Sequence, residues 1–313
     1  MPGDHDHAPL RVAVLGPGGV GGLLGALLAR QGERVVMLAR PATAARLAEQ
    51  GLRLRSPMLG DAQVAVEADT RLREPVDVCL LTVKAPQLAG AVEAVPAEAL
   101  GGALLVPFLN GVDHLPWLRE RYPARQVVAG TIRVEATRVA PGVIEHDSPF
   151  AAVELAVGPA DRGRVEDLAG RLRACGLDVK VRDDEAFTLW TKLAVLAPIA
   201  LLTTWAAVPV GPARERHPEL AAALVGEVAA AARGDGVVLD EAVGAAMMAR
   251  APAEMRSSMQ KDAEAGRALE LDAIGGAVLR AAARAGTDVP VTARLVAELQ
   301  ERHRAPVAWP ARR

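Results

Sequence analysis

The first 120 residues alternate between short apolar runs and longer segments of mixed polarity. Leu10 to Leu15 is an apolar run of the kind that forms a buried parallel strand. The glycine-rich stretch "GPGGVGG" follows, then a segment of helical length and a second strand, "RVVMLAR". "VDVCLLTVKA" and "ALLVPFLNG" predict two more buried strands. Strands that alternate with helices are typical of a parallel α/β sheet.

From Gln126 to Val181 the apolar runs are shorter and more polar. "GVIEH" and "FAAVELAVG" predict a meander that closes the sheet, and a helix and the strand "LDVKV" follow. The remainder is rich in Ala, Leu, Glu and Arg, which favours helices.

Two acids, Asp183 and Asp184, precede the first apolar helix of this remainder as N-terminal signals. We therefore predict an α/β fold with two domains. Residues 1–183 form a Rossmann-type, mostly parallel sheet, and residues 184–313 form an all-α domain.

The composition fits a globular protein of two domains. The chain has 313 residues, 51% of them hydrophobic and 24% charged, with a formal net charge of -2. This charge predicts no nucleic-acid or membrane partner. The N-terminus carries acids where a signal peptide needs positive charge, so we expect a cytoplasmic protein. The histidines of His5–His7 fit a solvated chain end better than a metal site, and no metal is predicted.

The glycine-rich stretch contains the spacing G-x-G-x-x-G at Gly16, Gly18 and Gly21. In dinucleotide-binding folds the first glycine makes a tight turn, the second lets the backbone approach a pyrophosphate, and the third lets the helix pack on the strand. Gly19 and Val20 complete the first helical turn, whose free N–H groups hold phosphates. Because the motif follows a strand and opens a helix, it predicts a dinucleotide site.

The end of the second strand bears on the choice of cofactor. Enzymes that bind NAD usually carry Asp or Glu there, to hold the ribose 2′-hydroxyl. This strand ends in Ala39 and Arg40. A guanidinium suits the 2′-phosphate, so we predict NADP(H), while a solvated arginine and an NAD-linked enzyme stay open as alternatives.

Three polar residues are candidates for a site because of their position in the pattern. Lys84 and Asn110 end two predicted strands, where ligands of open α/β sheets bind. Lys192 is the one charged residue in "TLWTKLAVLAPIALLTTW", with Leu196 and Ala200 one and two turns further along its face. Burial disfavours the charged form of a lysine, which makes Lys192 either a proton donor near neutral pH or a structural residue that reaches water.

"RSSMQKDAEAGRALELD" adds a serine and an acid. Ser258 and Glu270 are twelve residues apart, which on one helix would direct them about 120° apart. Gly266 interrupts the run, so we predict two helices with a turn and both side chains at one cleft. Alternatively, Ser258 caps a helix and Glu270 is a first-turn acid.

Together these motifs resemble the ketopantoate reductase family (2-dehydropantoate 2-reductase). The resemblance rests on "VLGPGGVGG", "LLTVKAPQL", "LNGVD", "GTIRVEATRVAPGVIEH", "LWTKLAV", "SSMQKD" and "ELDAIGG". It implies a two-domain NADPH enzyme that reduces ketopantoate to pantoate, on the way to coenzyme A. The family's essential lysine falls on Lys192 and its acid on Glu270. Its substrate-binding serine falls on Ser258, and its strand-end lysine and asparagine fall on Lys84 and Asn110.

The sequence departs from the family at two positions that help to hold the substrate. Leu196 and Ala200 stand where the family typically has asparagines. The chain is therefore either a reductase of ketopantoate or a related 2-oxo compound, with Lys192 as general acid, or a paralogue that reduces a less polar carbonyl or imine. A non-catalytic NADP(H) sensor is the alternative from another class. The Ala-rich second domain also favours a homodimer.

Overall fold

The structure, a computed structural model, describes residues 8–305 and divides into two compact units. Unit 1 comprises Met1–Val83, Gln87–Leu109 and Leu118–Asp183, and unit 2 comprises Lys84–Pro86, Asn110–Trp117 and Asp184–Arg313. Two short segments that follow strands of unit 1 in the chain therefore belong to the helical unit. The histidines at His5–His7 and the last eight residues lie outside the described part.

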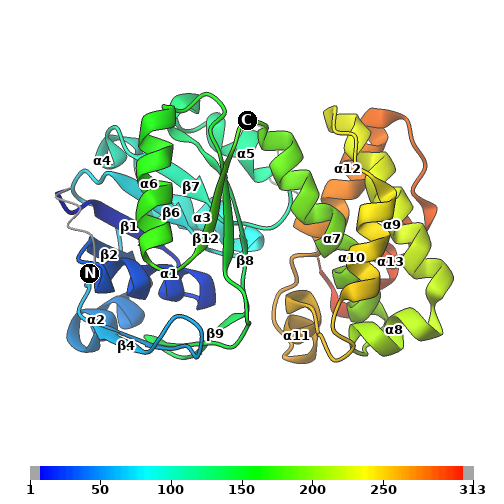
Figure 1. Cartoon of the computed structure of the whole chain (residues 1–313), viewed down its shortest axis with the longest axis horizontal. Coiled ribbons are helices and arrows are strands. Elements are labelled where there is room, and N and C mark those ends of the chain that lie inside the picture. The colour runs from blue at the N-terminus through cyan, green and yellow to red at the C-terminus, as the bar shows by residue number, and fades with distance from the viewer. Residues whose placement is uncertain (1–7, 306–313) are drawn as a thin grey trace. The chain divides into compact units, whose positions relative to one another are not determined.

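Unit 1 is built on a five-stranded parallel sheet with the order β5-β2-β1-β6-β7 (Figure 1). The strands are β1 (Arg11–Leu15), β2 (Arg34–Leu38), β5 (Glu67–Asp69), β6 (Val78–Leu81) and β7 (Leu104–Pro107). The helices of this part are α1 (Gly19–Arg30), α2 (Pro41–Gln50), α3 (Leu88–Ala91) and α4 (Ala97–Leu100). β6 and β7 are buried along their whole length, as central parallel strands require. The predicted Rossmann-type sheet is confirmed.

The predicted meander is wrong, because its two strands lie in different sheets. β10 (Val143–His146) pairs with β3 (Leu52–Arg55) and β9 (Ala136–Ala140), and β4 (Ala62–Val64) completes that sheet. β11 (Ala152–Ala156) pairs with β8 (Ala129–Arg133) and β12 (Asp178–Arg182), and α6 (Arg162–Ala174) connects β11 to β12.

Burial explains why the two strands separate. β10 alternates between buried and partly exposed residues, so it has one dry face, and there Ile144 packs on Gly22 of α1. β11 is buried along almost its whole length, and, like β10, it has a partner strand on each edge. β10 therefore suits a sheet with one face partly exposed to solvent, and β11 suits a sheet whose faces are both covered.

Unit 2 is helical, as the sequence predicts, and it includes one long apolar helix, α7 (Figure 1). Its helices are α7 (Glu185–Ala206), α8 (Val210–Arg216), α9 (Pro218–Ala232), α10 (Glu241–Arg250), α11 (Ser258–Glu264), α12 (Ala277–Ala285) and α13 (Pro290–His303). A π-helical segment, Asp272–Gly276, leads into α12, and the short helix α5 (His114–Arg119) begins in the segment Asn110–Trp117. α11 ends two residues before Gly266, which has a φ of +62°, so the predicted break between two helices is confirmed.

α7 is long and apolar enough to cross a membrane by length and composition. Its position in unit 2 gives a simpler explanation of its apolar residues. It packs against α8, α9, α10, α11 and α13. Of its most apolar 18-residue stretch, 61% is buried. α7 is therefore the central core helix of this unit.

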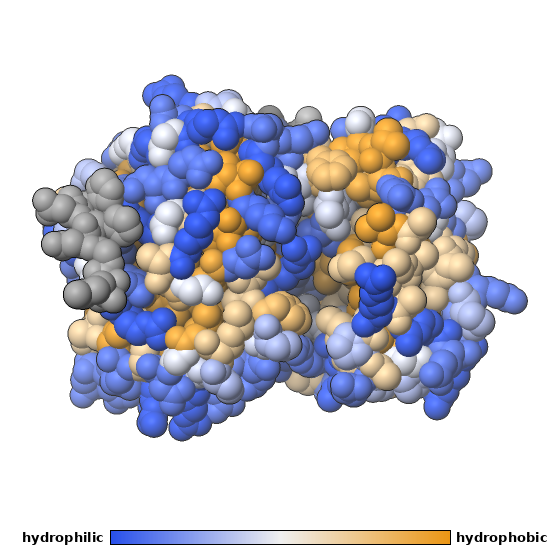
Figure 2. All heavy atoms as spheres, viewed as in Figure 1, coloured by the Kyte–Doolittle hydropathy of each residue, from blue (hydrophilic) through white to orange (hydrophobic). Residues whose placement is uncertain are grey.

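The surface of unit 2 keeps some apolar side chains. Figure 2 shows apolar residues on its visible face among hydrophilic ones. Val238, Val243 and Met247, around the start and middle of α10, are exposed large hydrophobic residues.

The start of α7 is fixed by a side-chain cap. The Asp184 carboxylate accepts a hydrogen bond of 2.8 Å from the backbone N–H of Phe187, which the helix itself leaves without a partner. The predicted N-terminal signal is confirmed. Asp183, its neighbour, instead forms an exposed ion pair with Arg162.

We expect Asp184→Ala to lower the free energy of unfolding by about 1 kcal/mol, because one helix N–H loses its acceptor. Asp183→Ala is the matched control and should cost less, since exposed ion pairs contribute little. Urea unfolding followed by circular dichroism measures both. Equal losses in the two variants would contradict the cap.

Candidate functional site

The glycine turn of unit 1 is held in shape by residues that follow β6. Gly16 has a φ of +100°, and a Cβ there would lie 2.7 Å from Cγ1 of Val83. The hydroxyl of Thr82 donates hydrogen bonds to the carbonyl oxygens of Leu15, at 3.0 Å, and Gly16, at 2.8 Å. Only glycine fits the first position of the motif.

The next residues leave room for a ligand at the start of α1. A Cβ on Gly18 would meet nothing within 4 Å, whereas a Cβ on Gly19 would lie 1.9 Å from the carbonyl oxygen of Ala136. A Cβ on Gly21 would lie 2.2 Å from the Gly16 oxygen, and Val20 is half-buried. The first N–H groups of a helix lack partners in the helix and attract anions. The open space at Gly18 therefore fits the pyrophosphate of a dinucleotide.

Arg40 follows β2 and is exposed at the N-cap position of α2. An acid does end the neighbouring strand β5: Asp69 pairs with Leu38 in the register of the sheet. Its carboxylate is already engaged, because the guanidinium of Arg73 donates to it at 2.6 Å and lowers the pKa of Asp69 to about 2.

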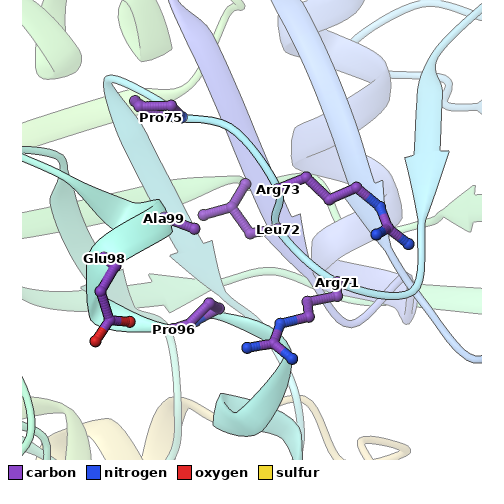
Figure 3. Close-up of a pocket in the computed structure, with 7 residues that line it drawn as sticks. All are labelled: Arg71, Leu72, Arg73, Pro75, Pro96, Glu98 and Ala99. Atoms are coloured by element: carbon purple, nitrogen blue, oxygen red, sulfur yellow. The ribbon is translucent and has the colours of Figure 1, made fainter.

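An open pocket of unit 1 lies beside this region and is shown in Figure 3. Its lining comes from the loop after β5 and from the residues around the start of α4: Arg71, Leu72, Arg73, Pro75, Pro96, Glu98 and Ala99. None of the residues predicted for the site lines this pocket.

The predicted acid of unit 2, Glu270, is 6% exposed and holds two chain segments. Its Oε1 accepts a hydrogen bond of 3.2 Å from the backbone N–H of Ala85, and its Oε2 accepts one of 3.0 Å from Nδ2 of Asn110. Asn110 and Glu270, 160 residues apart in the chain, are thus brought together. A carboxylate has about four acceptor positions, so each oxygen can accept a further bond.

Lys84 is also engaged within unit 2. Its ammonium is ion-paired with the carboxylate of Asp262, whose side chain is 3% exposed and also accepts from Nε of Arg267 at 2.8 Å. A buried carboxylate needs such partners, because an unpaired one would be costly. Lys84 therefore anchors the segment Lys84–Pro86.

The turn after Asn110 lies tightly against the π-helical segment. Gly111 has a φ of +85°, and a Cβ there would lie 2.1 Å from the carbonyl oxygen of Ala273. Asp113 accepts a 2.8 Å bond from Arg280, which also donates to Asp272 at 2.7 Å. π-Helical turns are rare and frequently mark functional sites.

Lys192 is half-buried on α7, and Leu196 is half-buried one turn later. Ala200, two turns later, is 0% exposed. The charge of Lys192 acts on a residue that the sequence did not single out, His114, which is also 0% exposed. Burial, and then the charge of Lys192, lower the pKa of His114 to about 3.

The predicted serine, Ser258, is exposed at the first position of α11. The helix is capped by its neighbour: Oγ of Ser257 accepts from the backbone N–H of Gln260 at 3.0 Å and lies 2.8 Å from Oγ1 of Thr203. Because Ser257 and Ser258 are adjacent and identical, the sequence does not indicate which one caps the helix and which one is exposed.

The sequence analysis also gave no role to Thr82, Ala85 or Asp262. Ala85 contributes only its backbone N–H, which no side-chain pattern reveals. Asp262 could have been found, since it lies four residues after Ser258 on a short helix. Within residues 8–305, no group of three or more His, Cys, Asp or Glu side chains could hold a metal ion.

A parallel sheet with a glycine turn at the start of α1, together with a helical unit that carries a buried acid, an asparagine and a lysine, defines a two-domain oxidoreductase. The family models agree with this class. "Ketopantoate reductase PanE/ApbA" matches residues 12–161, and "Ketopantoate reductase PanE/ApbA C terminal" matches residues 187–303. The chain belongs to the ketopantoate reductase family, whose enzymes use a nicotinamide cofactor.

Relatives agree along nearly the whole chain. The chain is 30% identical over 293 residues to a 2-dehydropantoate 2-reductase of Halobacterium salinarum, covering 90% of this chain and 95% of that one. A ketopantoate reductase structure from Ralstonia eutropha is 28% identical, with a TM-score of 0.84 over 94% of this chain and 99% of that one. A D-mandelate dehydrogenase, solved with NADH and anilino(oxo)acetate, is 21% identical with a TM-score of 0.85 over 94% and 99%, and shares the fold.

Two adjacent glycines allow a test of the cradle at α1. We expect Gly18→Ala to weaken binding of the dinucleotide at least tenfold with little change in Tm, because its methyl would fill open space needed by the pyrophosphate. Gly19→Ala should lower Tm, because its methyl meets the Ala136 carbonyl. Fluorescence titration with NADPH and thermal unfolding measure the two effects. Normal nucleotide affinity in Gly18→Ala would contradict this assignment.

Proposed function

We propose that this oxidoreductase catalyses the NADPH-dependent reduction of 2-dehydropantoate, or a closely related 2-oxo acid, to the 2-hydroxy acid. The family assignment supports this reaction, and so does the cluster in which Glu270 binds Asn110 and the Ala85 backbone. Unit 1 binds the cofactor at Gly16, Gly18, Gly19, Val20 and Gly21. Unit 2 binds the substrate and supplies the proton.

The phosphorylated cofactor is supported by the end of β2. β2 is followed by Ala39 and the exposed Arg40, where an NAD-binding enzyme usually has an acid. The carboxylate of Asp69, at the end of the neighbouring strand, already accepts a hydrogen bond from Arg73. Arg40 also stands at the start of α2, where the helix dipole favours negative charge. These features suit a 2′-phosphate better than a free 2′-hydroxyl.

When bound, the reduced nicotinamide supplies a hydride to the carbonyl carbon. The carbonyl oxygen then gains negative charge and needs a proton. Nζ of Lys192 stabilises that charge and donates the proton. Glu270, held by Asn110 and Ala85, accepts a hydrogen bond from a substrate hydroxyl or from Lys192.

The remaining predicted residues bind and orient. Exposed Ser258 donates a hydrogen bond to the substrate carboxylate, and Asn110 orients substrate and nicotinamide. Lys84, ion-paired with Asp262, maintains the segment that contributes the Ala85 N–H.

A second candidate is the reduction of a less polar carbonyl compound or imine. It is favoured by Leu196, which gives the face of Lys192 a half-buried hydrocarbon where the family has an amide. An amide that binds a hydroxyl discriminates strongly between analogues, and a leucine does not. Comparison of kcat/KM for 2-dehydropantoate with that for 2-oxo acids lacking the hydroxyl separates the two candidates.

The partners that follow are a small carbonyl compound and NADP(H). The cytoplasmic location and the homodimer predicted from the sequence stay predictions. The exposed residues Val238, Val243 and Met247 are apolar surface that a second copy could cover.

We expect Arg40→Ala to raise the Kd for NADPH at least tenfold and to change the Kd for NADH little, because only the former carries the 2′-phosphate. Arg46→Ala, also exposed and on α2, is the matched control and should leave both values unchanged. Isothermal titration calorimetry measures the four constants. A parallel change for both nucleotides would argue against NADP selectivity at Arg40.

Lys192→Ala should lower kcat by about 10²–10⁴ and leave NADPH binding intact, because the proton donor is lost. Lys192→Arg keeps the charge but holds its proton too firmly to donate it, so it should also be slow. Exposed Lys180→Ala is the control and should have normal turnover. The assay follows NADPH absorbance. Turnover near wild type in Lys192→Ala would contradict the role of Lys192 as proton donor. If the wild type binds NADPH tightly but reduces no carbonyl compound, the result would favour a non-catalytic sensor.

A further inference from the structure

Two cations of unit 2 are paired with the same buried carboxylate, that of Asp262. The ammonium of Lys84 is paired with its Oδ2, and Nε of Arg267 donates to its Oδ1 at 2.8 Å. The Asp262 side chain is 3% exposed, whereas those of Lys84 and Arg267 are 40% and 58% exposed. The acid is thus buried, and both cations reach solvent. Because one carboxylate balances only one cation, this group of three carries a positive charge in excess.

The end of α11 holds Arg267 in place. Gly266 has a φ of +62°, and the backbone N–H of Arg267 donates to the carbonyl oxygen of Asp262 at 2.8 Å. A glycine in the left-handed conformation followed by this bond is a Schellman helix end. The side chain of Arg267 then donates to the carboxylate of the same residue. The guanidinium is therefore fixed both through its backbone and through Nε.

Arg280 shows how an arginine of unit 2 looks when the fold uses all its nitrogens. Its Nε and Nη2 donate to Asp113 at 3.2 and 2.8 Å, and its Nη1 donates to Asp272 at 2.7 Å. Arg267 differs. Its Nε donates to Asp262, its Nη2 makes a long bond of 3.3 Å to a backbone carbonyl, and its Nη1 has no partner among the residues that the structure describes. The support of Asp262 thus leaves open donors on this guanidinium.

Open guanidinium donors next to an ammonium suit an oxyanion. Arginine binds carboxylates and phosphates through two parallel N–H bonds, and hydrogen bonds between ionised groups are stronger than neutral ones. The ammonium of Lys84 has three N–H donors, which is more than its ion pair with Asp262 requires. Ser258 lies one helical turn before Asp262 on α11, so its hydroxyl belongs to the same face of that helix. Two charged donors and one hydroxyl therefore surround a single acid.

The position of Arg267 in the chain favours the substrate as the source of this oxyanion. Arg267 lies three residues before Glu270, which accepts a hydrogen bond from a substrate hydroxyl in the proposed reaction. One short segment can therefore supply both the cation for an acid group and the acceptor for a hydroxyl.

We propose that the guanidinium of Arg267 binds the carboxylate of the 2-oxo acid, with Lys84 and Ser258 beside it, and so gives the enzyme a preference for acids over neutral carbonyl compounds. This inference rests on the proposed reduction of a 2-oxo acid. A phosphate of the cofactor is also an oxyanion, so the same variants are titrated with NADPH to distinguish the two sources.

The first experiment measures the preference for an acid. The wild type should have a higher kcat/KM for 2-oxobutanoate than for its methyl ester, which keeps the carbonyl group and lacks the charge. Arg267→Met should lower kcat/KM about tenfold for the acid and little for the ester, because only the acid loses a charged partner. Arg267→Lys keeps the charge and should recover part of the preference. Arg284→Met, which removes an ion pair with Asp235, is the matched control and should leave the ratio unchanged.

Two results of this experiment would overturn the proposal. Equal losses for the acid and the ester in Arg267→Met, with a lower Tm, would mean that Arg267 only supports the fold. A higher Kd for NADPH in the same variant, with an unchanged ratio of acid to ester, would assign the oxyanion to a phosphate of the cofactor.

The second experiment does not depend on turnover. Isothermal titration calorimetry measures binding of 2-hydroxybutanoate and of the neutral 2-hydroxybutanamide to the enzyme loaded with NADP⁺. Arg267→Met should raise the Kd for the acid about tenfold and leave that for the amide unchanged. An unchanged Kd for the acid would contradict the proposal. If the wild type reduces no 2-oxo acid and yet binding of the acid depends on Arg267, the proposed function fails and the carboxylate site stands.

Discussion

The buried carboxylate of Glu270 is the constraint on which the arrangement of unit 2 depends. A carboxylate that is 6% exposed must have hydrogen-bond donors, and it finds them in the Ala85 N–H and the Asn110 amide. These two donors come from separate chain segments, each of which follows a strand of the parallel sheet in the sequence. The need to satisfy one acid therefore fixes both segments, and with them the turn at Gly111 and the position of His114.

Charge balance in unit 2 follows the same logic. Asp262 is paired with Lys84 and Arg267, and Asp113 and Asp272 share Arg280. Burial raises the pKa of Asp272, and its hydrogen bond from Arg280 opposes that rise. These acids, buried or partly buried, are thus all paired with a cation, and two of them share one arginine. The ring of His114 stands apart from these pairs, since it is neutral and has only the electrostatic influence of Lys192.

The features that the sequence predicted are those with local causes. The glycine turn follows from a tight backbone at Gly16, and the cap of α7 follows from one acid at Asp184. The separation of β10 from β11 depends on the pairing of β10 with β3, which is distant in the chain, and of β11 with β8, which β9 and β10 separate from it in the sequence, so the order of the strands along the chain does not reveal it. The site shows the same limit. Glu270 and Asn110 were predicted from their motifs, and the structure brings them together. Ala85 contributes only a backbone group, and His114 looks like any histidine near the start of a short helix.

The two departures from the family on α7 are unequal in physical terms. Ala200 is 0% exposed, so its side chain cannot contact a ligand without movement of the surrounding helices, and its small size matters for packing. Leu196 is half-buried and lies one turn from Lys192, so it retains surface on that side of the helix. A change in substrate preference at these positions is therefore carried by Leu196. Hydrocarbon there cannot bind a substrate hydroxyl, but it leaves the hydrogen bond between Asn110 and Glu270 unchanged.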